Sequence, residues 1–250
     1  MGLALCSACA DAAPPTVSLV DGPCADVYGA DVCTWAEVEN EEVVRIGATI
    51  PLSSIENAPP EAEMAWPPVA LANIPLPEIA IEGTGAQSLK IYWEAHGHPP
   101  GPYLVPHFDF HFYTISTEQI DAIDCSDVTK PSALPAGYDL PDVDIPEIGH
   151  LVGLCVPKMG MHAMLKSELE SDEPFSGALV VGSYAGDPIF YEPMITQDLM
   201  MQQESFSLDF PAIPGDVPGV TLPTQFEAVY DEEAAAYRFV FWGFPQQDTP

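Results

Sequence analysis

Alternation of apolar and polar residues predicts that this chain folds mainly into strands. The clearest case is the stretch 105–115, where Phe108, Phe110 and Phe112 alternate with polar side chains. Successive side chains of a strand point to opposite faces, so one face of this strand carries phenyl rings and the other carries polar groups. Residues 88–94 alternate in the same way. We expect the phenyl face to join a core, and the polar face to be paired, solvated or bound to a ligand.

Turn signals predict two hairpins and several loops around this strand. One hairpin is expected over 177–192 and the other between 226–230 and 237–242. Ser116 could cap a short helix, and Pro193 is expected to open a helix over 194–203. The remaining stretches are expected to be loops: the proline-rich segments 51–80 and 204–224, and the acidic segment 126–150.

These elements predict a mainly β fold. The 28 prolines among 250 residues disfavour long helices, and the apolar content is ample for a core. We expect a single antiparallel β-sandwich or cupin-like barrel with a few short helices. Residues 1–40 are expected to form an N-terminal arm, and residues 41–250 a single β-rich domain.

The charge balance excludes two classes of partner. The chain has 6 Lys and Arg against 38 Asp and Glu, which gives a formal charge of −32. The basic residues are scattered singly, so no patch could neutralise phosphates, and we expect neither nucleic acid nor an anionic membrane surface as a partner. High salt would screen the self-repulsion. A halophilic or marine source is our first explanation for the acidity, and a calcium-binding surface the second.

Cysteine spacing predicts an oxidising compartment. Cys24 and Cys33 flank a short loop, and Cys125 and Cys155 flank the acidic segment, so each pair could form a disulfide. The C-x-x-C spacing of Cys6-Ser7-Ala8-Cys9 is not followed by a second pair. The first ten residues are typical of the tail of a signal peptide. We therefore expect a secreted or periplasmic protein.

Histidines and carboxylates near the phenyl-rich strand predict a metal site. Four of the six histidines lie within residues 96–111. His107 and His111 are four residues apart, about 13 Å along a regular strand, so they cannot share one ion unless the strand bends. A site would combine members of this strand with ligands from elsewhere. The candidate ligands are His98, His107, Asp109, His111, His162 and Glu192.

We hypothesise one transition-metal ion bound by His98, His162 and members of the 107–111 cluster. Imidazole and carboxylate ligands suit zinc, iron, manganese, nickel or copper. Calcium is a second candidate cofactor, since the loop 126–150 carries several carboxylates, although without EF-hand spacing. The alternative to a metal site is a solvated strand face on which histidines happen to cluster.

Four motifs occur here in an order that resembles a known family. They are His98-Pro99-Pro100-Gly101, Pro106–Tyr113, Met159-Gly160-Met161-His162, and Gly182-Ser183-Tyr184 leading to Glu192-Pro193-Met194. Over residues 85–200 the chain is similar to mostly exported, functionally uncharacterised bacterial proteins with the domain of unknown function DUF5602. Family members usually have an aromatic residue where this chain has Ala163. The resemblance implies a β-rich, exported homo-oligomer with a shared polar cluster, and it implies no reaction.

Three function classes remain. The protein could be an exported metal-binding protein, a structural oligomer whose histidine cluster closes an interface, or a metal-dependent enzyme with a mononuclear cupin-like site that takes a small molecule. We rank the binding and structural roles above the enzyme because no general base stands out in the sequence. A closed four-ligand site would favour the first two classes, and an open three-ligand site facing a pocket would favour the enzyme.

Overall fold

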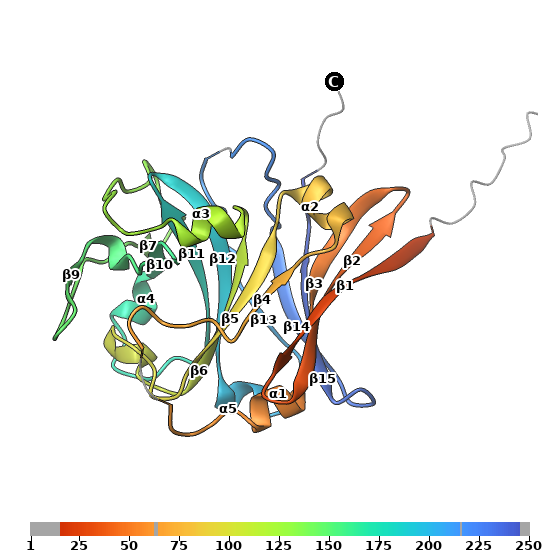
Figure 1. The fold of residues 1–250 in the computed structure, drawn as a ribbon, viewed down its shortest axis with the longest axis horizontal. Helices are drawn as coiled ribbons and strands as arrows, with labels where there is room; N and C mark the ends of the chain where they lie inside the picture. The colour runs from red at the N-terminus through yellow and green to blue at the C-terminus, as the bar shows by residue number, and fades with distance from the viewer. Residues whose placement is uncertain (1–15, 63–64, 216, 246–250) are drawn as a thin grey trace, which may run out of the picture.

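Two antiparallel β-sheets pack face to face (Figure 1). The computed structural model describes residues 16–62, 65–215 and 217–245. The six-stranded sheet has the order β1 (Val17–Val27), β2 (Ala30–Glu39), β3 (Glu42–Pro51), β15 (Ala236–Trp242), β14 (Gln225–Asp231) and β13 (Phe206–Leu208). The seven-stranded sheet has the order β4 (Ala72–Pro75), β5 (Ser88–Glu94), β6 (His107–Tyr113), β12 (Asp187–Thr196), β11 (Gly177–Tyr184), β10 (Met161–Leu165) and β7 (Tyr138–Asp139).

The predicted β-sandwich is therefore confirmed, and the described strands do not close into a barrel. A separate hairpin joins β8 (Val143–Ile145) to β9 (Gly149–Leu151). The helices are short: α1 (Leu52–Glu56), α2 (Glu78–Thr84), α3 (Thr117–Asp121), α4 (Lys166–Leu169), α5 (Gln197–Met200) and the 3-10 turns η1 (Gly101–Tyr103) and η2 (Val152–Leu154). None of the described helices is long and apolar enough to cross a membrane.

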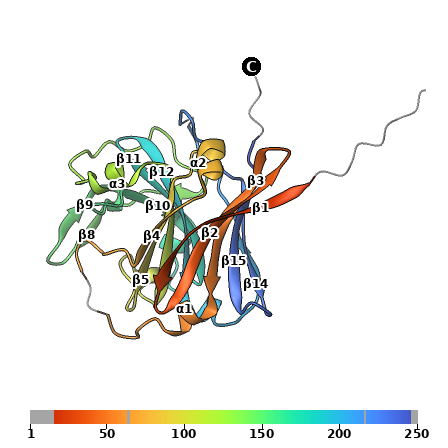
Figure 2. The ribbon, with the colours of Figure 1, turned by 45° about the vertical axis from the view of Figure 1, so that its right-hand side comes forward.

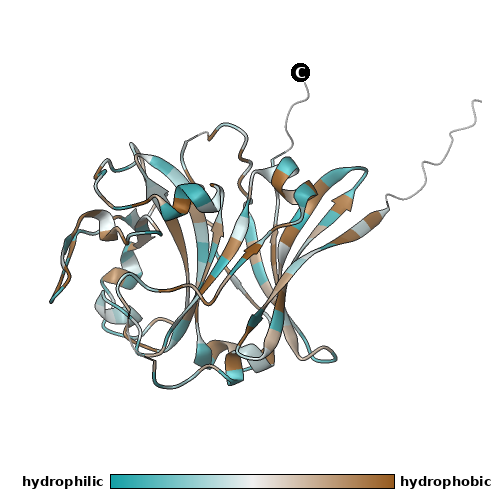
Figure 3. Cartoon of the chain, viewed as in Figure 1, coloured by the Kyte–Doolittle hydropathy of each residue, from teal (hydrophilic) through white to brown (hydrophobic). Residues whose placement is uncertain are grey.

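The phenyl face of β6 lies in the core between the two sheets, as the alternation predicts. Phe110 packs edge-on against Phe239 of β15 with 4.8 Å between ring centroids, and Phe112 packs against Phe241 at 4.7 Å. Hydrophobic and hydrophilic residues are interspersed along the strands in Figure 3. Because β6 is central in its sheet, both of its neighbours fix its register.

The opposite face of the seven-stranded sheet is covered by loops and short helices. The side chains of this second core include Tyr113, Ile120, Leu154, Phe190 and Met194. Figure 2 shows β8 and β9 on the side of this sheet that faces away from β14 and β15. The polar face of β6 is therefore buried, and each polar group on it needs a partner that is not bulk water.

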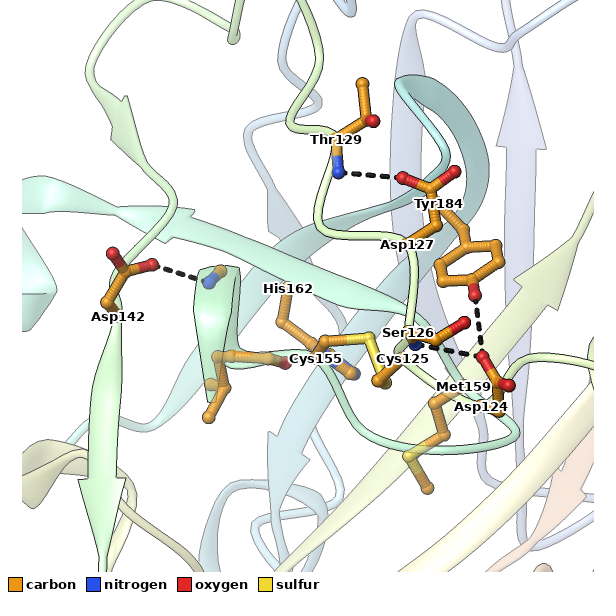
Figure 4. Close-up of a disulfide and its surroundings, with 12 residues drawn as sticks. Asp124, Cys125, Ser126, Asp127, Thr129, Asp142, Cys155, Met159, His162 and Tyr184 are labelled. Carbon is orange, nitrogen blue, oxygen red and sulfur yellow. Dashed lines mark hydrogen bonds between the residues drawn. A yellow bond between two sulfur atoms is a disulfide. The ribbon is translucent and has the colours of Figure 1, made fainter. Parts of the chain in front are cut away.

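Several local predictions hold. Ser116 caps α3 in a capping box with Gln119. Both predicted hairpins form, as β11–β12 and β14–β15. The two predicted disulfides are present, Cys24–Cys33 and Cys125–Cys155, and Figure 4 shows the second of them together with His162 and Met159. Cys6 and Cys9 lie outside the described residues.

Several local predictions are wrong. The segments 126–150 and 204–224 are not loops throughout, because the first contains β7, β8 and the start of β9, and the second contains β13. The segment 51–80 is not one loop, because it contains α1, β4 and the start of α2. Pro193 does not open a helix, because β12 continues to Thr196 and only Gln197–Met200 is helical. Met194 and Ile195 continue the strand alternation into the two cores, and this burial outweighs the local preference of the proline.

The N-terminal arm expected over residues 1–40 is also different from Val17 onwards. Residues 17–39 form β1 and β2, which pair with each other and with β3. Val32 and Ala36 of β2 are fully buried in the core between the sheets. This segment is therefore part of the sandwich.

Candidate metal centre

The buried polar face of the seven-stranded sheet gathers all six candidate ligands. His107, Asp109 and His111 lie on β6, and the strand register places Glu192 of β12 beside His111. His162 lies on β10, two strands beyond β12 in the same sheet. His98 comes from the loop between β5 and η1.

A glycine makes room for the histidine from β10. Gly182 of β11 lies opposite His162 in the register, and a side chain at Gly182 would overlap the ring of Phe190. That ring packs against His162 and His111, with centroid separations of 5.2 and 4.7 Å. The small residue therefore lets β12 and β10 bring their side chains together across β11.

The six residues form two groups of three. The His111 triad consists of His111, His162 and Glu192, and the His98 triad consists of His98, His107 and Asp109. Within each triad, one ligand atom of each residue lies within 4.8 Å of the other two. His98 and His162 therefore belong to different triads, and the single site that we expected to combine them is divided. The cause is the separation of His107 and His111 along β6, which the sequence indicated.

Two of the three ligand-atom separations in the His111 triad are close to those of a tetrahedral metal site, and the third is within 4.8 Å. His111 Nε2 lies 3.4 Å from Glu192 Oε2 and 3.5 Å from His162 Nε2. Metal–ligand bonds of about 2.0–2.1 Å place neighbouring tetrahedral ligands about 3.3–3.4 Å apart. The side chains of His111 and Glu192 are each only 1% exposed. An ion at the centre of the triad would therefore be held in a deeply buried position.

The electrostatics of the His111 triad favour neutral imidazoles. The Nδ1–H of His162 donates to the carbonyl of Leu154 at 3.0 Å, so its Nε2 lone pair is directed toward the triad. Burial lowers the pKa of His162 to about 4, and burial together with His162 lowers the pKa of His111 well below its usual value. Both rings are then neutral at neutral pH, with one unprotonated nitrogen each, as metal ligands must be.

Glu192 is the acidic group of this triad, and no cationic side chain in the described part of the chain compensates its charge when it ionises. Burial, reinforced by the charge of Asp109, raises the pKa of Glu192 well above its usual value. Its Oε2 atom has no hydrogen-bond partner among the described residues. A buried carboxylate without a partner is strongly disfavoured, and a bound cation would remove that penalty.

The His98 triad can compensate its own charges. His107 donates from Nδ1 to the carbonyl of Val105 at 2.6 Å, and its Nε2 lies 3.3 Å from Asp109 Oδ1. Burial opposes ionisation of both residues, but their mutual attraction raises the pKa of His107 and lowers that of Asp109 to about 2. His98 lies farther away, with Nε2 3.8 Å from Asp109 Oδ2. His107 Nε2 and Asp109 Oδ1 have, like Glu192 Oε2, no hydrogen-bond partner among the described residues. At 3.3 Å, however, they can form an imidazolium–carboxylate ion pair, which compensates both charges without a metal ion.

Both triads face one cavity of about 70 Å³. His162 and Glu192 of the first triad and His98 and Asp109 of the second line its wall, whereas His111 and His107 do not. The sequence did not identify the other lining residues as candidate site residues. Most of them are apolar, and one is Glu94, whose pKa burial and then Asp109 raise to about 7. No sequence signal identified Glu94; the β5–β6 register of the structure places it opposite His107.

The acidic loop does not gather calcium ligands among the residues that the structure describes. Asp142 pairs with Lys130 at 2.7 Å and accepts from the backbone of Gly153, and Asp144 pairs with His150 at 2.9 Å. No carboxylate of the loop belongs to either triad. These acidic groups have partners within the chain, so the loop offers no argument for a calcium site.

Comparisons of the chain with protein-family models, curated proteins and solved structures gave no match. The resemblance to exported proteins with domain DUF5602 therefore stays a prediction, and the function has to be argued from the residues themselves.

Proposed function

We propose that the protein binds one transition-metal ion through the His111 triad. The observation that carries this proposal is the convergence of three buried ligand atoms, of which Glu192 Oε2 has no other partner among the described residues. Without an ion, the raised pKa keeps a proton on Glu192, and that proton could be donated to only one of the two imidazole nitrogens, His111 Nε2 or His162 Nε2. An ion satisfies all three ligand atoms at once.

The ligand spacing favours a tetrahedral ion. In an octahedral site with bonds of about 2.1 Å, neighbouring ligands lie only about 3.0 Å apart. The separations of 3.4 and 3.5 Å in the His111 triad are closer to the tetrahedral value. Two imidazoles and one carboxylate are also a known ligand set for zinc. Zinc is therefore the first candidate among the metals that the ligand types allow.

Metal analysis tests this proposal directly. Protein purified without a His-tag or chelator should contain or take up about one equivalent of zinc. Glu192→Gln and His162→Gln should each weaken binding strongly, about 10- to 100-fold or more. His96→Ala and His150→Ala are matched controls, because these two side chains are about half exposed and outside both triads. Less than about a tenth of an equivalent, with no uptake on titration, would refute the proposal.

We also propose that the protein works outside the cytoplasm. The support for this is the pair of disulfides, Cys24–Cys33 and Cys125–Cys155, since such bonds persist mainly in oxidising compartments. Fractionation of producing cells, with the oxidation state of the four cysteines measured by thiol labelling, is the test. The homo-oligomer implied by the family resemblance is a further proposal, to be tested by light scattering of the purified protein.

A metal-dependent enzyme is a second candidate function. The observation that favours it is the position of the His111 triad, which supplies three ligands and presents two of them to a cavity. Catalytic zinc sites keep a fourth position for water or substrate, whereas structural sites are closed by four protein ligands. An enzyme of this kind would show turnover that disappears when the metal is removed and returns when it is restored.

A further inference from the structure

The proposed metal site shares its cavity with a set of apolar side chains, and this combination points to a ligand. Resting on the proposed function, we infer that the cavity binds a small molecule with one metal-coordinating end and an uncharged, apolar body. His162 and Glu192 belong both to the His111 triad and to the cavity wall. The ion would therefore meet the cavity on the side that the protein ligands leave open.

The apolar part of the wall comes from five separate parts of the chain. Trp66 lies at the rim and is 40% exposed, and Ile145 and Ile148 come from the β8–β9 hairpin. Leu154 comes from η2, and Met164 and Met194 come from the sheet itself. Such a surface gains free energy by covering the apolar part of a ligand, at roughly 25 cal/mol for each Å² removed from water.

The charges of the wall restrict the polar part of the ligand. The titratable side chains of the wall are Glu94, His98, Asp109, His162 and Glu192, and no Lys or Arg is among the described residues that line it. The metal ion would then be the main positive partner for a ligand. A second anionic group at the far end of the ligand would be buried beside apolar side chains without a cation, which is strongly unfavourable.

The volume restricts the size. A cavity of about 70 Å³ is less than half of the roughly 150 Å³ that accommodates benzene in an engineered apolar cavity. The body of the ligand that fits inside is therefore a short aliphatic chain rather than a substituted ring. Acetate, propionate and butyrate are suitable probes, because they share one coordinating group and differ only in the number of methylenes.

The experiment uses protein loaded with Co²⁺, whose visible absorption reports ligands that enter the metal coordination sphere. Each added methylene should tighten binding about fourfold, so butyrate should bind about 16-fold more tightly than acetate. Succinate places a carboxylate where butyrate has its methyl group, and it should bind no better than acetate. Equal affinities along the series, or succinate binding as tightly as butyrate, would overturn the inference.

One variant tests whether the apolar wall causes the chain-length effect. Ile148 is partly exposed at the turn of the β8–β9 hairpin and belongs to neither triad. Ile148→Asp should leave Co²⁺ uptake unchanged and reduce the butyrate-to-acetate affinity ratio to nearly one, whereas an unchanged ratio would contradict the inference. If Co²⁺ does not bind at all, the proposed function itself fails. If Co²⁺ binds but no carboxylate changes its spectrum, only the ligand inference fails.

Discussion

The two faces of β6 should respond in opposite ways to substitution. Phe110 is 1% exposed and lies between the sheets, where its ring contacts Phe239 across the sandwich and stacks near Phe108 at 5.8 Å. Phe110→Ala removes a buried ring, and such substitutions lower the free energy of unfolding by about 3–5 kcal/mol. The neighbouring strands β5 and β12 hold β6 in place on both sides, so the space can collapse only slightly. We expect the upper half of this range.

His111→Ala should destabilise the metal-free protein much less. The imidazole loses its contacts with the rings of Tyr113 and Phe190, but its removal also eliminates a buried Nδ1 atom that has no hydrogen-bond partner among the described residues. These effects oppose each other, and we expect a net loss of about 1–2 kcal/mol. The same substitution should abolish or strongly weaken metal binding, which Phe110→Ala should not affect directly.

Urea unfolding of the chelator-treated protein measures both values. The metal must be absent because a ligand that binds only the folded state adds about 2.7 kcal/mol at a hundred times its dissociation constant. A parallel series with zinc should stabilise the wild type and leave His111→Ala unchanged. If His111→Ala unfolds the metal-free protein as severely as Phe110→Ala, the polar face of β6 is a packed, hydrogen-bonded core and not a metal site.

Three further predictions concern charge, covalent structure and pH. Because the formal charge is −32, the melting temperature should rise as sodium chloride increases from about 0.05 to 1 M. A flat or falling series would show that repulsion between surface charges does not limit stability, and it would also exclude the halophile interpretation. Replacing both Cys125 and Cys155 by Ser opens a loop of 30 residues and should cost about 3–4 kcal/mol in urea unfolding. It should also weaken zinc binding in a titration, since Leu154, the hydrogen-bond partner of His162, directly precedes Cys155; unchanged affinity would show that the bridge does not position this ligand. Because the pKa of His162 is about 4 in the folded protein and about 6.5 when unfolded, the unfolded metal-free chain binds its proton first, and stability should fall as the pH decreases from about 6.5 to about 4. His162→Gln should reduce that pH dependence, and an equal slope in the variant would mean that other groups cause it.

The parts of the fold that follow from local rules could be predicted from the sequence. A period of two residues assigns Phe110 and His111 to opposite faces whatever the rest of the chain does. The same rule places His107, Asp109 and His111 on one face, and it keeps His107 and His111 about 13 Å apart along the strand. The capping box of Ser116 is equally local, since its partners are three residues apart.

The parts that depend on strand order and on packing between distant segments could not be predicted. Nothing near Glu192 in the sequence indicates that β12 is the strand beside β6, and nothing near His162 indicates that Gly182 leaves space for it across β11. Pro193 carries a local helix signal, but the burial of Met194 and Ile195 on alternate faces outweighs it, and that burial is not visible locally. The division into two triads depends on this long-range arrangement.

The difference between the triads explains why the proposal assigns one ion and not two. In the His98 triad, the attraction between His107 and Asp109 offsets the burial of both, so an ion would have to displace a proton from a stable pair. In the His111 triad, burial holds both imidazoles neutral and leaves the Glu192 carboxyl without a cationic partner. Burial raises the pKa of Glu192, so a metal ion has to displace its proton as well, but the ion then supplies the cationic partner that the ionised carboxylate lacks.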